Sequence, residues 1–80
     1  MSRKGELKKE IDDKEREIEA LEKKRARSQS ALMTAMLTNT KPKKEDVDYF
    51  STFTALIDKE RDELRKLYKE LAELANNGKK

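Results

Sequence analysis

The sequence predicts an all-α protein, an antiparallel two-helix hairpin of the coiled-coil kind that associates into a helical bundle. Three observations predict it. Apolar residues recur in two stretches at alternating steps of three and four, the spacing of a coiled-coil stripe. One proline, Pro42, stands between the two stretches, and 46% of the residues are charged against 34% hydrophobic. Such a composition is typical of long exposed helices, so we expect a single helical-hairpin domain over residues 1–80.

The first helix is expected over residues 5–38. Gly5 weakens its beginning, and the stretch L-T-N-T-K at 37–41 is poor helix sequence that ends it. Three polar residues interrupt its apolar stripe, which reads Leu7, Ile11, Lys14, Ile18, Leu21, Arg25, Ser28, Leu32 and Ala35.

A turn at 39–42 and a second helix over 43–76 follow. Pro42 is expected in the first turn of that helix, where its missing N–H costs nothing, with acidic residues close behind it that favour the helix dipole. Gly78 is a stop signal, so 77–80 is expected to be a short polar tail. The stripe of this helix is more regular: Phe50, Phe53, Ile57, Glu60, Leu64, Leu67, Leu71 and Leu74.

Glu60 is the one charge in the second stripe, and the hairpin geometry suggests its partner. In an antiparallel pair the residue numbers of facing positions add to a constant. A total of 85 brings most stripe positions of the two helices together, leaves Lys14 facing Leu71, and places Arg25 opposite Glu60, as a seam charge pair. The same register predicts neighbours beside the seam: Glu22 with Arg61, Lys24 with Glu63, and Met36 with Val47.

Near the turn the chain holds more apolar residues than one seam can cover. The predicted partner-binding residues are Met33, Met36, Leu37, Val47, Tyr49 and Leu56. Exposed apolar groups of this kind mark partner surfaces, and methionine suits adaptable ones. The expected partner is a second copy, as a homodimer or higher oligomer, or a helical protein that this chain serves as a small assembly, adaptor or chaperone-like subunit. The plainer alternative is that these residues only thicken the hairpin near its turn.

The composition argues against catalysis and against bound cofactors. The chain has no cysteine and no histidine, which removes the commonest metal ligands and the commonest acid–base group. Its two glycines stand at opposite ends and form no phosphate loop. No apolar run approaches the length of a membrane span or of a signal-peptide core. We therefore expect a soluble, cytoplasmic, non-enzymatic protein without cofactor or metal.

One stretch resembles an enzyme family. Residues 7–26 carry Ile11, Asp12, Ile18, Leu21 and Arg25 in the pattern of the first helix of the all-helical chorismate mutases. The resemblance implies a substrate-binding arginine at Arg25. The lysine of that family expected near residue 36 is replaced by Met36, and its third helix is missing.

Nucleic-acid binding is the alternative function. The densest basic stretches are 23–27 and 41–44. In architecture the chain is similar to the plasmid Rop proteins, small hairpins that dimerise and bind RNA along a bundle face. The resemblance implies a dimeric four-helix-bundle regulator that binds RNA or DNA. Acidic residues interspersed among the basic ones favour a solvated helix surface instead.

Overall fold

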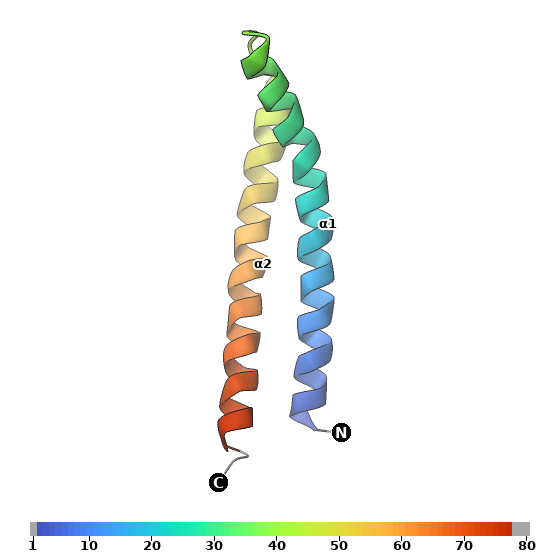
Figure 1. Cartoon of the computed structure of the whole chain (residues 1–80), viewed down its shortest axis with the longest axis vertical. Helices are drawn as coiled ribbons and strands as arrows, with labels where there is room; N and C mark the ends of the chain where they lie inside the picture. The colour runs from blue at the N-terminus through green and yellow to red at the C-terminus, as the bar shows by residue number, and fades with distance from the viewer. Residues whose placement is uncertain (1, 78–80) are drawn as a thin grey trace.

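The computed structural model describes residues 2–77 and consists of two long helices. Helix α1 spans Arg3–Leu37 and α2 spans Lys44–Asn77, 35 and 34 residues long. They run antiparallel, with the turn at one end of the molecule and both termini at the other (Figure 1). The hairpin is a rod with extents of 61 × 19 × 16 Å. The predicted all-α hairpin is confirmed: 91% of the described residues are helical.

Helix α1 begins earlier than its sequence suggests. Ser2 adopts an extended backbone conformation, and its hydroxyl accepts a hydrogen bond from the Gly5 backbone N–H at 3.2 Å. A serine at this position satisfies one of the amides that a helix start leaves without a partner. This cap moves the beginning of the helix to Arg3 despite the cost of Gly5.

Helix α1 ends in a Schellman motif built on Asn39. The Thr40 N–H donates to the Ala35 carbonyl at 2.9 Å, and the Asn39 N–H donates to the Met36 carbonyl at 3.2 Å. Asn39 has a φ of 56°, the left-handed conformation that this motif requires and that asparagine tolerates better than most residues. The hydroxyl of Thr38 adds a bond to the Thr34 carbonyl at 2.8 Å. The helix therefore stops at a defined residue.

The loop before α2 is longer than predicted. It covers residues 38–43, and the first helical carbonyl is that of Lys43, which accepts from the Val47 N–H at 3.2 Å. The placement of Pro42 in the first turn of α2 was wrong, because Pro42 precedes this capping residue. The expected acidic residues do occupy the first turn, as Glu45 and Asp46. Of the predicted tail, Asn77 belongs to α2, and 78–80 lie outside the described residues.

The two stripes predicted from the sequence form the seam between the helices. Every stripe position of both helices is buried or half-buried. Leu7 and Ile57 are completely covered, and the buried residues are Leu7, Ile11, Ile18, Ser28, Ala35 and Ile57. The identity of the seam residues is thereby confirmed.

The register between the stripes differs from the prediction. Three hydrogen bonds join the helices beside the seam: Glu15–Tyr68, Glu22–Arg61 and Arg3–Glu70. The residue numbers add to 83 for the first two, on one side of the seam, and to 73 for the third, on the other side. The seam lies between these sides, so its facing positions add to about 78, one heptad below the predicted 85.

The predicted Arg25–Glu60 pair is therefore wrong. The Glu60 carboxylate accepts a hydrogen bond from the Lys14 ammonium at 2.6 Å, while Arg25 lies two turns of helix away, with its guanidinium 5.9 Å from the centre of the Phe50 ring. Glu63 also binds Lys14, so its predicted pairing with Lys24 fails too. A shift of one heptad still sets stripe positions of one helix against stripe positions of the other, and stripe periodicity alone does not distinguish the two registers. The predicted neighbours Glu22 and Arg61 do form an ion pair.

Candidate protein-interaction surface

The surface of the rod divides into two parts along its length. We call residues 2–23 and 58–77 the open half and residues 24–57 the turn half. Among the described residues, every ion pair with nitrogen and oxygen within 4.0 Å belongs to the open half. The charges of the open half therefore largely neutralise one another within the hairpin.

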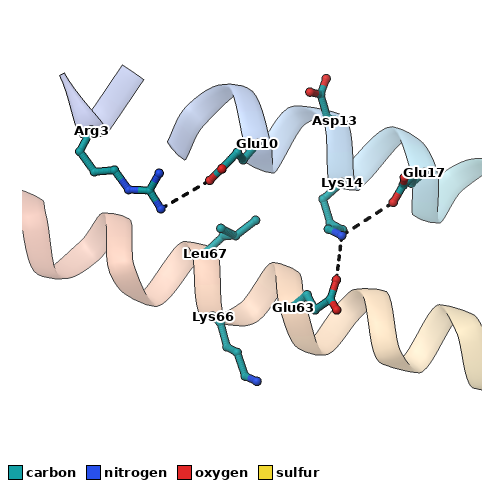
Figure 2. A pocket seen from close by; sticks show the side chains of 8 residues that line it. All are labelled: Arg3, Glu10, Asp13, Lys14, Glu17, Glu63, Lys66 and Leu67. Carbon is teal, nitrogen blue, oxygen red and sulfur yellow. Dashed lines mark hydrogen bonds and ion pairs between the residues drawn. The ribbon is translucent and has the colours of Figure 1, made fainter. Parts of the chain in front are cut away.

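Lys14 is the centre of the largest cluster in the open half. Its ammonium lies 2.6 Å from the Glu60 carboxylate, 2.8 Å from Glu63 and 3.8 Å from Glu17. Figure 2 shows it between the Glu17 and Glu63 carboxylates, which come from different helices. The hydrogen bond to Glu60, followed by the one to Glu63, raises the pKa of Lys14, and the Lys14 bond lowers the pKa of Glu60. This cluster ties the two helices together at a partly buried seam position.

The groove around Lys14 is not a good candidate for a ligand site. It has a volume of about 520 Å³ and is lined mostly by charged residues of both helices (Figure 2). Its cations already have partners in the hairpin: Lys14 as described above, and Arg3 with Glu70 at 2.8 Å. The hydrogen bond from Arg3 also lowers the pKa of the Glu70 carboxyl. Because these charges satisfy each other, the groove is best explained as part of the fold.

The turn half has the opposite electrostatic character. It contains six basic and three acidic residues, a net charge of +3, against −2 for the open half. Within residues 24–57, all of which the structure describes, no side chains form an ion pair within 4.0 Å. Its cations other than Arg25 are exposed and consequently open to solvent or to a partner.

The turn half also exposes nearly all of the large apolar side chains that the rod leaves uncovered. They are the six predicted partner-binding residues: Met33, Met36, Leu37, Val47, Tyr49 and Leu56. Met36 and Leu37 are the extreme cases, with 79% and 84% of their surface exposed. Tyr68 is the one large apolar residue among 2–77 exposed in the open half, and its hydroxyl donates to Glu15 at 2.8 Å, which raises the pKa of the phenol.

The six residues do not share one side of the hairpin. Their heptad positions place Met33, Met36, Leu37 and Val47 on or toward the side that carries the Glu22–Arg61 pair, and we call this set the methionine side. Tyr49 and Leu56 fall on the opposite side, that of the Arg3–Glu70 pair. In the heptad Met36 and Val47 occupy e positions, Met33 a b position and Leu37 an f position, whereas Tyr49 and Leu56 both occupy g positions.

The opposite side holds a hollow that sequence reasoning did not identify. We call Lys24, Arg27, Tyr49, Phe53 and Leu56 the tyrosine side. All of them except Leu56, together with Ser28, line a hollow of about 300 Å³. The Tyr49 ring stacks on Phe53, with centroids 6.2 Å apart and planes 18° from parallel. The tyrosine side thus places exposed aromatic surface beside two cations.

Arg25, the residue singled out by the likeness to chorismate mutases, lies in the seam. Its guanidinium packs over the Phe50 ring and makes a long hydrogen bond of 3.5 Å to the Thr54 hydroxyl. These contacts account for its half-buried position between the helices.

Comparison with protein-family models, with curated proteins and with solved structures finds no match to this chain. Neither helix, over the residues that the structure describes, is long and apolar enough to cross a membrane. The same residues contain no group of three or more acidic side chains placed to hold a metal ion.

Proposed function

We propose that the protein is a protein–protein interaction module that acts through its turn half, as a small assembly or chaperone-like subunit, and that it binds a second copy of itself through the methionine side. The observation that carries the proposal is the exposure of Met33, Met36 and Leu37, three large apolar side chains on adjacent turns of α1. A contiguous apolar stripe of this size on so polar a protein favours a covered state in an assembly.

The neighbourhood of the methionine side supports contact between like surfaces. On this side of the turn half the e positions of the heptad are Gln29, Met36, Val47 and Thr54, and all four are uncharged. In the open half the same positions include Glu15, Glu22 and Arg61, which pair across the seam or with Tyr68. Two copies related by a twofold axis could therefore bring their methionine sides together without like charges meeting in the contact.

The experiment is light scattering across a range of protein concentrations. The wild type should be larger than a monomer at micromolar concentrations, and its melting temperature should rise with concentration. The variant Met33→Glu/Leu37→Glu should be a helical monomer, because the contact would have to bury two charges. Ala20→Glu/Ala72→Glu, which adds the same charges at exposed positions of the open half, is the matched control and should associate like the wild type.

Two results would contradict the proposal. A wild type that stays monomeric with a melting temperature independent of concentration would rule out self-association. A Met33→Glu/Leu37→Glu variant that loses its helix content would show that these side chains belong to the core of the hairpin.

A further inference from the structure

The tyrosine side continues along α1 into a second hollow at the turn. This hollow, of about 490 Å³, is lined by Arg27, Ala31 and Ala35 on α1 and by Lys41 and Lys43 in the loop, among others. Arg27 also lines the hollow beside Tyr49, so the two adjoin. We call these two hollows together the basic groove, since they follow one another along the same side of α1 from Lys24 to the turn.

The charge of the basic groove is one-sided. Lys24, Arg27, Lys41 and Lys43 line it, against a single acidic residue, Asp46. In the part of the chain that the structure describes, none of the four cations lies within 4.0 Å of a carboxylate. The groove of the open half in Figure 2 has cations of the same kind, but carboxylates of the hairpin hold Arg3 and Lys14. Of these two grooves, the basic groove is therefore the one that offers its charge to a negative partner.

The floor of the basic groove suits a helix. Ala31 and Ala35 are small, so another backbone can approach α1 closely, and Tyr49 and Leu56 add exposed apolar surface along its edge. The groove follows α1 for about 20 Å, the length of roughly four helical turns. Phe53 packs against the Tyr49 ring, which remains 57% exposed and offers apolar surface to the docked helix.

We infer that the basic groove docks an acidic amphipathic helix as the third helix of a bundle. Apolar residues of that helix lie on Ala31, Ala35 and Tyr49, and its glutamates or aspartates face Lys24, Arg27 and Lys43. This inference rests on the proposed function, because it names the partner chemistry of the same turn half. It uses the side opposite the methionine side, so a dimer formed through the methionine side leaves the groove open.

The test uses two synthetic peptides of about 20 residues, long enough for the groove at 1.5 Å per residue. Both carry leucines at a and d positions; one has glutamates and the other lysines at e and g. Fluorescence anisotropy with the full-length protein, across a salt series, should show binding of the glutamate peptide, weakened by salt, and no binding of the lysine peptide. The third probe is an oligothymidine of similar length.

Variants locate the site. Lys24→Glu/Arg27→Glu should weaken the glutamate peptide by at least about tenfold and give the lysine peptide measurable affinity. Lys8→Glu/Lys9→Glu, which reverses two exposed charges of α1 in the open half, is the matched control and should bind like the wild type. If the charge-reversed variant loses helicity by circular dichroism, Arg27→Gln takes its place, with a smaller loss expected for the same peptide.

Three results would overturn the inference: no binding of the glutamate peptide, equal binding of both peptides, or tighter binding of the oligothymidine that depends on Lys24 and Arg27. The last would make the groove a nucleic-acid site. These failures are distinct from failure of the proposed function, which is read from the mass of the wild type and of Met33→Glu/Leu37→Glu.

Discussion

The open half and the turn half share one seam but have different surfaces. Both are built on the same two helices and the same alternation of a and d positions, and each contains one completely covered residue, Leu7 in the open half and Ile57 in the turn half. Outside the seam, the open half forms all of the ion pairs and exposes one large apolar residue, Tyr68, whereas the turn half forms no ion pair and exposes six, over the residues that the structure describes. The seam is thus similar along the rod, and the exposed apolar groups are concentrated at one end.

The largest effect should come from the shared seam. Ile57→Ala and Leu7→Ala each remove a fully covered side chain and should each cost about 2–4 kcal/mol, measured by urea unfolding at fixed protein concentration. Leu56→Ala, next in sequence but 40% exposed, is the control and should cost less than about 0.5 kcal/mol. If Leu7→Ala lowered the free energy of unfolding much less than Ile57→Ala, the seam would not be equivalent in the two halves.

The Lys14 cluster should give the next effect. Lys14→Leu leaves the Glu17, Glu60 and Glu63 carboxylates without their shared cation. Loss of one partner of a fully buried pair costs about 3–5 kcal/mol, and since this cluster is partly exposed, we expect roughly 1–2 kcal/mol. Lys14→Leu with Glu60→Leu should recover most of that loss, because apolar side chains would then complete the seam.

Arg25 is the matched seam cation of the turn half. It has no carboxylate partner, so Arg25→Leu should change the free energy of unfolding by less than about 1 kcal/mol, the scale of its contact with Phe50. A double-mutant cycle by urea unfolding measures both cases. Additive effects of Lys14→Leu and Glu60→Leu, or a strong coupling of Arg25 with Glu60, would speak against the register of the structure.

Acid should weaken the open half before the turn half. Hydrogen bonds from Lys14 and Arg3 lower the pKa of Glu60 and of Glu70. The stabilisation from such groups is present above the carboxyl pKa of the unfolded chain, about 4.3 for glutamate, and is lost as the pH falls through the lower folded value. Carbon chemical shifts along the backbone, followed from neutral to acid pH, should lose helical character first in the open half. Simultaneous loss in both halves would contradict the role assigned to these pairs.

The end of α1 should also give a small effect. Asn39→Ala places an ordinary side chain in the left-handed conformation and should cost about 1 kcal/mol, whereas Asn39→Gly should be neutral or slightly stabilising. Thermal unfolding of the two variants checks the difference. Equal stability of both would indicate that residue 39 does not adopt a positive φ in solution.

The sequence was sufficient to predict the helices and the residues of the seam, because apolar periodicity reports which face of a helix is covered. It was not sufficient to predict the register. A coiled-coil pattern repeats every seven residues, so a shift of one heptad still sets stripe positions against stripe positions, and the register depends on the loop and on a few polar pairs. Lys14 and Arg25 are both seam cations. The sequence pattern predicted Arg25 as the partner of Glu60, whereas the structure pairs Glu60 with Lys14.

For the candidate surface, the sequence predicted exposed residues but not their arrangement. Met36 and Tyr49 both lie near the turn in sequence, yet they lie on opposite sides of the hairpin, the methionine side and the tyrosine side. The basic groove was missed for a related reason: Arg27 and Lys43 come from separate basic stretches, and their proximity depends on where α1 ends. The Schellman motif at Asn39 determines that end.

The position of the termini has a practical consequence. Both ends of the described chain lie at one end of a rod 61 Å long, and the loop lies at the other (Figure 1). A hairpin attached through a terminus is therefore held at the end of the rod opposite the turn. A fluorophore, sensor chip or carrier protein fixed at either terminus would leave the methionine side and the basic groove facing outward, far from the support. A label placed on the loop, within 38–43, would obstruct both, so the point of attachment decides whether a binding assay can detect a partner at all.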